Sequence, residues 1–118
     1  METGGLVWGM TGAVTLLLLF LAAVLEAGGD ALVRAGLRSA VPLRVAFLLG
    51  GAVVLFVYGC AVNAPRWDFG RLLGVYMVLF FVVAQLTAWV AFRELPSAGI
   101  LLGGAFILVG GLIVFAKG

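Results

Sequence analysis

Four long apolar stretches, separated by short polar segments, make up most of this chain. We place them at about residues 6–35, 43–62, 69–92 and 97–116. A hydrocarbon core about 30 Å thick is crossed by roughly 20 apolar residues of helix, and each stretch reaches that length. The stretches are apolar on every side and do not alternate, which argues against a membrane β-barrel. The sequence therefore predicts an all-α membrane protein, a four-transmembrane-helix bundle that forms one domain over residues 1–118.

The composition supports a bilayer as the solvent and excludes several function classes. Only 10% of the residues are charged, whereas 65% are apolar; a soluble domain carries roughly 25% charged residues. The chain has no histidine and a single cysteine, Cys60, so we expect no metal site, no cofactor, no catalytic residues and no enzyme activity. The seven basic residues form no run, so nucleic acid is not expected as a partner. We expect an integral, multi-pass protein of a bacterial-type inner membrane, with the lipid bilayer as a partner.

The basic residues are almost evenly divided between the two sides of the predicted bundle. Four spans put one group of three on the side of the termini and a group of four on the other side: Arg66, Arg71 and Lys117 against Arg34, Arg38, Arg44 and Arg93. Orientation in a membrane follows this imbalance. So small a difference predicts insertion in both orientations and an antiparallel homodimer. The alternative is a single orientation, set by the three arginines between the first two spans.

Glu26 and Asp30, both in the first span, are the most informative residues of the sequence. At helical spacing, small and polar residues form one stripe on an otherwise leucine-rich helix: Thr11, Thr15, Ala22, Glu26, Asp30 and Arg34. We expect this stripe to face inward, with Arg34 one turn from Asp30 and able to pair with it. An ionisable group at membrane depth is costly and marks a functional site by default.

A second interpretation of the first span remains open at this point. Residues 6–25 are themselves a run of 20 residues without a charge. If that run crosses the membrane, Glu26 begins an interfacial segment and only meets lipid headgroups. The two interpretations differ in the depth of one carboxylate.

Several segments resemble the small multidrug resistance transporters. Residues 26–34, Glu-Ala-Gly-Gly-Asp-Ala-Leu-Val-Arg, resemble the first-helix pattern of that family, in which a membrane-embedded Glu precedes Gly and a Leu-x-Lys/Arg ending. Residues 92–96, Phe-Arg-Glu-Leu-Pro, followed by Gly103 and Gly110, are similar to its last loop and helix. The Gly-Arg at 70–71 and the Gly-Val-Tyr at 74–76 also resemble the family's small cousins.

The resemblance implies a fold, an activity and a site. Such transporters are four-helix subunits that dimerise, commonly antiparallel, into eight-helix assemblies, and they exchange protons for hydrophobic or guanidinium-type cations. Glu26 would then be the proton and cation site, Tyr76 a flanking aromatic residue, and the last helix the dimer contact. The chain departs from the pattern at residues 76–78, where Tyr-Met-Val replaces the family's Trp-Ser-Gly, and this bears on which cation is selected.

Other candidates come from the third and fourth spans without any family. The fourth span repeats small residues at the spacing that lets two helices approach closely, at Gly99, Gly103, Gly104, Gly110 and Gly111. We expect these glycines to form a dimer interface, although packing within one chain is the alternative. Gln85 is expected to bond a neighbouring helix or to line the substrate path, and Trp89 to anchor at the membrane interface or to face a bound cation.

The favoured function is a proton-coupled secondary transporter, an antiporter for a small cationic or amphiphilic substrate. One alternative is a flippase-like transporter of a lipid-linked or amphiphilic substrate. Another is a non-transporting subunit of a membrane assembly, in which Glu26 pairs with a basic residue of the partner.

Overall fold

A computed structural model describes the backbone of residues 2–117 and the side chains of residues 12–117. It contains four helices, with the bounds α1 (Glu2–Leu37), α2 (Leu43–Val62), α3 (Phe69–Phe92) and α4 (Ala98–Lys117). Residues 12–37 of α1 and the whole of each other helix are long and apolar enough to cross a membrane. The predicted four-span helical fold is confirmed. The observed bounds differ from the expected ranges mainly in α1, which begins at Glu2 and ends two residues later than expected.

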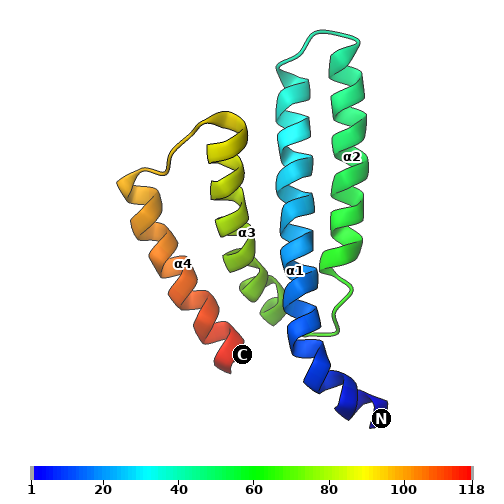
Figure 1. Ribbon diagram of the computed structural model, residues 1–118, viewed down its shortest axis with the longest axis vertical. Coiled ribbons are helices and arrows are strands. Elements are labelled where there is room, and N and C mark those ends of the chain that lie inside the picture. The colour runs from blue at the N-terminus through cyan, green and yellow to red at the C-terminus, as the bar shows by residue number, and fades with distance from the viewer. Residues whose placement is uncertain (1, 118) are drawn as a thin grey trace.

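The helices lie in a row, in the order α4, α3, α1, α2 (Figure 1). Extensive contacts join α1 to α2, α1 to α3, and α3 to α4. The chain measures 54 × 34 × 20 Å, so it is much wider than it is thick. Two helical hairpins, α1–α2 and α3–α4, therefore meet mainly through α1 and α3, with Tyr58 of α2 also reaching α3, and that contact holds the candidate site.

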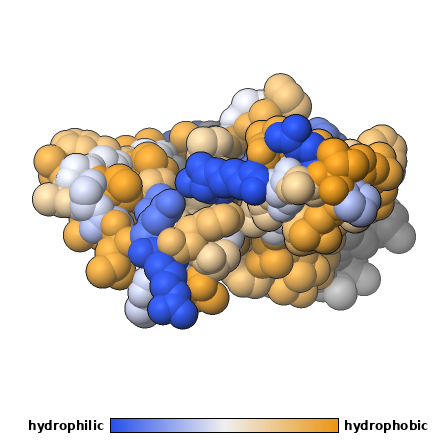
Figure 2. Space-filling model, turned by 90° about the horizontal axis from the view of Figure 1, so that it is seen from above, coloured by the Kyte–Doolittle hydropathy of each residue, from blue (hydrophilic) through white to orange (hydrophobic). Residues whose placement is uncertain are grey.

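Both chain termini and the α2–α3 loop lie at one end of the molecule (Figure 1). We call this the lower end, and the end with the α1–α2 and α3–α4 loops the upper end. Figure 2 looks down on the upper end and shows hydrophilic residues gathered there between hydrophobic ones. The arginines expected on that side are all exposed: Arg34, Arg38, Arg44 and Arg93.

Local hydrogen bonds explain where the helices end. The guanidinium of Arg44 donates to the carbonyl of Leu37 at 2.8 Å, which satisfies an acceptor left free at the end of α1. Arg93 closes α3 in the left-handed conformation, with φ of 58°, a role that glycine usually fills. Before α4, the hydroxyl of Ser97 accepts from the backbone N–H of Ile100 at 3.2 Å and caps the helix. Asp68 occupies the N-cap position of α3, but its side chain makes no capping hydrogen bond.

Glycines bring the helices of each hairpin close together. In the α1–α2 hairpin, a side chain of one helix lies over a glycine of the other, as Leu55 does over Gly29 and Val33 over Gly51. The α3–α4 hairpin uses the same device, with Phe81 over Gly104. Close backbone approach of this kind is how helices associate in lipid, where apolar burial gives no driving force.

Candidate functional site

A carboxylate and a tyrosine from different helices meet between the hairpins. The hydroxyl of Tyr76, on α3, donates to Oε1 of Glu26, on α1, with an oxygen–oxygen distance of 2.7 Å. Tyr76 is 2% exposed, and Glu26 is partly buried. A short hydrogen bond to a carboxylate is among the stronger ones in proteins, so it fixes the position of Glu26 toward the interior of the bundle.

Two further aromatic rings complete the surroundings of Glu26. The Tyr58 ring, from α2, lies 5.8 Å from the Tyr76 ring between centroids and close to the Glu26 carboxylate. The Phe80 ring stacks on Tyr76 at 6.0 Å. Three helices thus contribute to one cluster, which we call the Glu26 site: Glu26, Tyr58, Tyr76 and Phe80.

Small residues on α1 make this contact possible. Ala22 and Ala23 are fully buried and Ala27 is 5% exposed, so α3 can approach α1 closely just below and beside Glu26. Leu72 and Val75 of α3 close the packing from the other side, at 2% and 5% exposure. Apolar packing at this level excludes water from the lower side of the Glu26 site.

The stripe predicted on α1 faces the interior over its lower part. Thr15 is 1% exposed, and Ala22 is fully buried in the same direction, whereas Thr11 lies outside the residues whose side chains are described. Higher on the helix, Asp30 and Arg34 are exposed. The stripe is therefore buried in its lower part and exposed in its upper part, and Glu26 lies between the two parts.

Glu26 is the fifteenth of the 26 residues of its candidate span, Gly12–Leu37. It precedes Leu37, the last residue of α1, by eleven residues, which is about 16 Å of helix rise. Half of a hydrocarbon core is about 15 Å. The helix also continues without interruption from Glu26 to Leu37.

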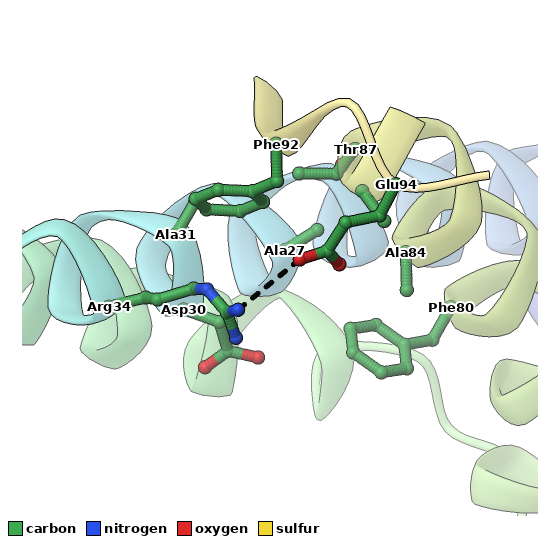
Figure 3. Close-up of a pocket in the computed structure, with 10 residues that line it drawn as sticks. Ala27, Asp30, Ala31, Arg34, Phe80, Ala84, Thr87, Phe92 and Glu94 are labelled. Atoms are coloured by element: carbon green, nitrogen blue, oxygen red, sulfur yellow. Dashed lines mark hydrogen bonds and ion pairs between the residues drawn. The ribbon is translucent and has the colours of Figure 1, made fainter. Parts of the chain in front are cut away.

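Above the Glu26 site, α1 and α3 separate and leave a cleft (Figure 3). We call it the upper cleft. The space within it is about 570 Å³, which includes solvent at its open side. Its polar and aromatic lining consists of Asp30, Arg34, Phe80, Thr87, Phe92 and Glu94, and alanines line the rest.

An ion pair crosses the upper cleft from α1 to the residues that follow α3. Nη2 of Arg34 lies 3.3 Å from Oε2 of Glu94, and its guanidinium lies over the Phe92 ring, 4.9 Å from the centroid. Arg34 does not pair with Asp30, the partner expected from helical spacing. The side chains of Arg34 and Glu94 are 43% and 55% exposed, and exposed pairs of this kind add about 0–1 kcal/mol to stability.

The other predicted site residues lie elsewhere in the chain. Gln85 is on the face of α3 that carries Phe81, which packs against α4, and its side chain makes no hydrogen bond within residues 12–117. Trp89 is 55% exposed and lines a separate shallow groove with Arg93 and Leu95. Within one chain, then, the structure brings Glu26 and Tyr76 together, places Asp30 one turn above, and leaves Gln85 and Trp89 apart from them.

The five glycines of the fourth span divide into two sets. Gly104 and Gly111 are buried against Phe81 and Val78 of α3 in the same chain. The second set is exposed on α4 and consists of Gly99, Gly103 and Gly110. No atom lies near the position that a Cβ would take at Gly103 or Gly110. Only the second set is free in this chain to contact another helix.

Sequence reasoning missed Tyr58 and Glu94 as neighbours of the site. The helices α1 and α2 are antiparallel neighbours, and the contact of Gly29 with Leu55 implies one of Glu26 with Tyr58 one turn further. The Arg34–Glu94 pair joins residues 60 positions apart, and no local pattern signals it. Within residues 12–117, no three His, Cys, Asp or Glu side chains gather as metal ligands.

This fold and site define an integral, multi-pass helical membrane protein with four candidate spans and a carboxylate enclosed by aromatic rings. Comparison with known proteins agrees. The chain is 32% identical over 102 residues to the UPF0060 membrane protein YfjF of Bacillus subtilis (strain 168), across 86% of this chain and 92% of that relative. It is 33% identical over 95 residues to the UPF0060 membrane protein DSY4157 of Desulfitobacterium hafniense (strain Y51), across 80% and 86%.

A UPF0060 membrane protein of Clostridium beijerinckii is similar over 104 residues at 31% identity, across 85% of this chain and 90% of that relative. The chain belongs to the UPF0060 family of membrane proteins. No family model and no solved structure matches it. The names of these relatives state a membrane protein and no substrate.

Proposed function

We propose that this protein is a proton-coupled secondary transporter that exchanges protons for a hydrophobic or guanidinium-type cation at Glu26. The observation that carries the proposal is the hydrogen bond between Tyr76 and Glu26, 2.7 Å long and enclosed by three helices. Burying an ionisable acid inside a membrane bundle is energetically costly, so such a residue marks a functional site by default. A proton and a cation compete for one carboxylate because each neutralises its charge, and that competition couples their movements.

The aromatic residues around Glu26 suit an organic cation. Tyr58, Tyr76 and Phe80 lie with neighbouring ring centroids 5.8–6.0 Å apart, and ring faces attract cations while tolerating apolar substituents. This chemistry agrees with the resemblance of residues 26–34 to the small multidrug resistance transporters. It favours an organic cation over a lipid-linked sugar, which would need more hydrogen-bonding groups than this cluster offers.

We also propose that the working unit is a homodimer, in which two copies of Glu26 face one site. Four helices in a row enclose no solute, and transporters commonly place substrate between two repeats of inverted topology. Open space in front of Gly103 and Gly110 leaves a smooth strip on α4 for a second copy. The near balance of basic residues between the two ends, four against three, favours antiparallel insertion.

The test is uptake of tetraphenylphosphonium into liposomes that contain the full chain and hold an outward proton gradient. We expect gradient-driven uptake by the wild type and a loss of at least about 100-fold, to the background of empty liposomes, in Glu26→Gln. The matched control is Asp68→Asn, the same change at an exposed carboxylate in the α2–α3 loop, which should retain uptake. Uptake by Glu26→Gln at the wild-type rate would refute the proposal.

Mixing the two chains tests the dimer. If each dimer needs both carboxylates, equal amounts of wild type and Glu26→Gln leave about one quarter of the activity, because only that share of random pairs is wholly wild type. Independent chains would leave about one half. The second result would contradict the paired site and leave the role of Glu26 itself standing.

A further inference from the structure

The guanidinium of Arg34, a cationic side chain of the protein itself, lies in the upper cleft. The guanidinium of Arg34 is held between a carboxylate oxygen of Glu94, at 3.3 Å, and the face of the Phe92 ring, at 4.9 Å. A carboxylate and an aromatic face are the two groups that recognise an organic cation. The contacts of Arg34 with Glu94 and Phe92 therefore indicate that the upper cleft can bind an organic cation.

Asp30 offers a second carboxylate to the same cleft. It lies on the cleft wall with Phe80 (Figure 3) and forms no ion pair within residues 12–117, because its neighbour Arg34 pairs with Glu94. Asp30 is one helical turn above Glu26 and one turn below Arg34 on the same face of α1. Its carboxylate therefore stands between the mouth of the cleft and the Glu26 site.

We propose that the upper cleft is a second binding site for organic cations, centred on Asp30 and Phe80, and that Arg34 regulates it as a tethered competitor. While Arg34 is paired with Glu94, Asp30 is free for a guest. When Glu94 is lost or moves away, Arg34 turns one helical turn to Asp30 and occupies the site itself. A cation leaving or approaching Glu26 on this side would pass Asp30. That transport role rests on the proposed function, whereas binding in the cleft does not.

The ion pair between Arg34 and Glu94 is weak and can change partners, as a regulatory contact must. Both partners are about half exposed, so the interaction is weak and can exchange partners at little cost. Glu94 follows Arg93, which holds a left-handed backbone conformation at the end of α3, so its position depends on the geometry of the α3–α4 connection. A shift between the two hairpins would therefore change which carboxylate Arg34 contacts.

The test measures binding of phenylguanidinium by titration calorimetry to the full chain in detergent. The Glu26→Gln background removes the inner carboxylate, so binding in the cleft is seen alone. We expect this background to retain binding, and the added change Asp30→Asn to weaken it about fivefold or more. Asp68→Asn, which removes an equal charge in the α2–α3 loop, should leave the affinity unchanged. Circular dichroism verifies that each variant is folded.

Four further variants separate competition by the Arg34 side chain from a general effect of removing a charge. Arg34→Gln should strengthen binding about threefold, whereas Arg38→Gln, which removes an equal charge at the same end of the molecule, should not. Glu94→Gln should weaken binding, because the freed Arg34 turns to Asp30, and adding Arg34→Gln should reverse that loss. The inference is overturned if Glu26→Gln abolishes binding, if Asp30→Asn matches Asp68→Asn, or if Arg34→Gln matches Arg38→Gln. Loss of uptake in Glu26→Gln liposomes tests the proposed function separately.

Discussion

The contact between α1 and α3 has a lower half that is apolar, with buried alanines beside an apolar groove toward α4, and an upper half that opens into a polar cleft. Below Glu26, Ala22 and Ala23 are fully buried and the helices touch. Above it, the same helix face carries Asp30 and Arg34 into a cleft. Successive turns of one helix are thus dry at one end and polar at the other, and Glu26 lies where the two environments meet. A carboxylate at such a boundary is packed on one side and lies one helical turn below an open cleft on the other, as the proposed exchange requires in one of its two states.

The largest expected effect on the free energy of unfolding comes from replacing alanine by leucine in the lower half of the contact between α1 and α3, compared with the same change in the upper half. Ala23 and Ala31 lie two turns apart on the same face of α1, one fully buried and one lining the upper cleft. Ala23→Leu should lower the free energy of unfolding by about 1–3 kcal/mol, because the closed half has no room for added methylene groups. Ala31→Leu should change it by less than about 0.5 kcal/mol.

Unfolding of the purified chain in mixed detergent and sodium dodecyl sulfate, followed by circular dichroism, measures both variants. Equal losses at the two positions would show that the upper half is packed as tightly as the lower one. Glu26 would then not lie at a boundary between a packed and an open region.

A smaller effect is expected for the hydrogen bond at the boundary. Tyr76→Phe removes the hydroxyl that donates to Glu26 at 2.7 Å, and should lower the free energy of unfolding by about 1 kcal/mol. Tyr58→Phe is the matched comparison, since its ring packs on Tyr76 and its hydroxyl also lies near Glu26, whereas the 2.7 Å bond to Glu26 is made by Tyr76. It should cost less than half as much. If Tyr58→Phe is the more harmful change in the same unfolding assay, the assignment of the donor is wrong.

The fold could be predicted almost entirely from the sequence, because span length and apolarity act locally along the chain. The inward stripe on α1 also follows from helical period, and Thr15 and Ala22 are buried as that stripe requires. The pairing of Tyr76 with Glu26 agrees with what the family resemblance implied; helical period alone does not place two helices side by side.

The contacts that escaped prediction all depend on how the hairpins are placed. Arg34 pairs with Glu94 instead of the nearer Asp30, because the α3–α4 connection carries Glu94 across the cleft. Gln85 shares a helix with Tyr76 but lies on the face toward α4. Helical spacing identifies which residues share a face, and only packing decides what that face meets.

Proton release on cation binding tests the central claim most directly. Saturating the full-length chain with tetraphenylphosphonium in weakly buffered detergent, with a pH indicator present, should release protons from the wild type and from Asp68→Asn. The same titration should release none from Glu26→Gln. Undiminished release from Glu26→Gln, or saturation of the wild type with no release at all, would contradict the exchange of a proton for a cation at Glu26.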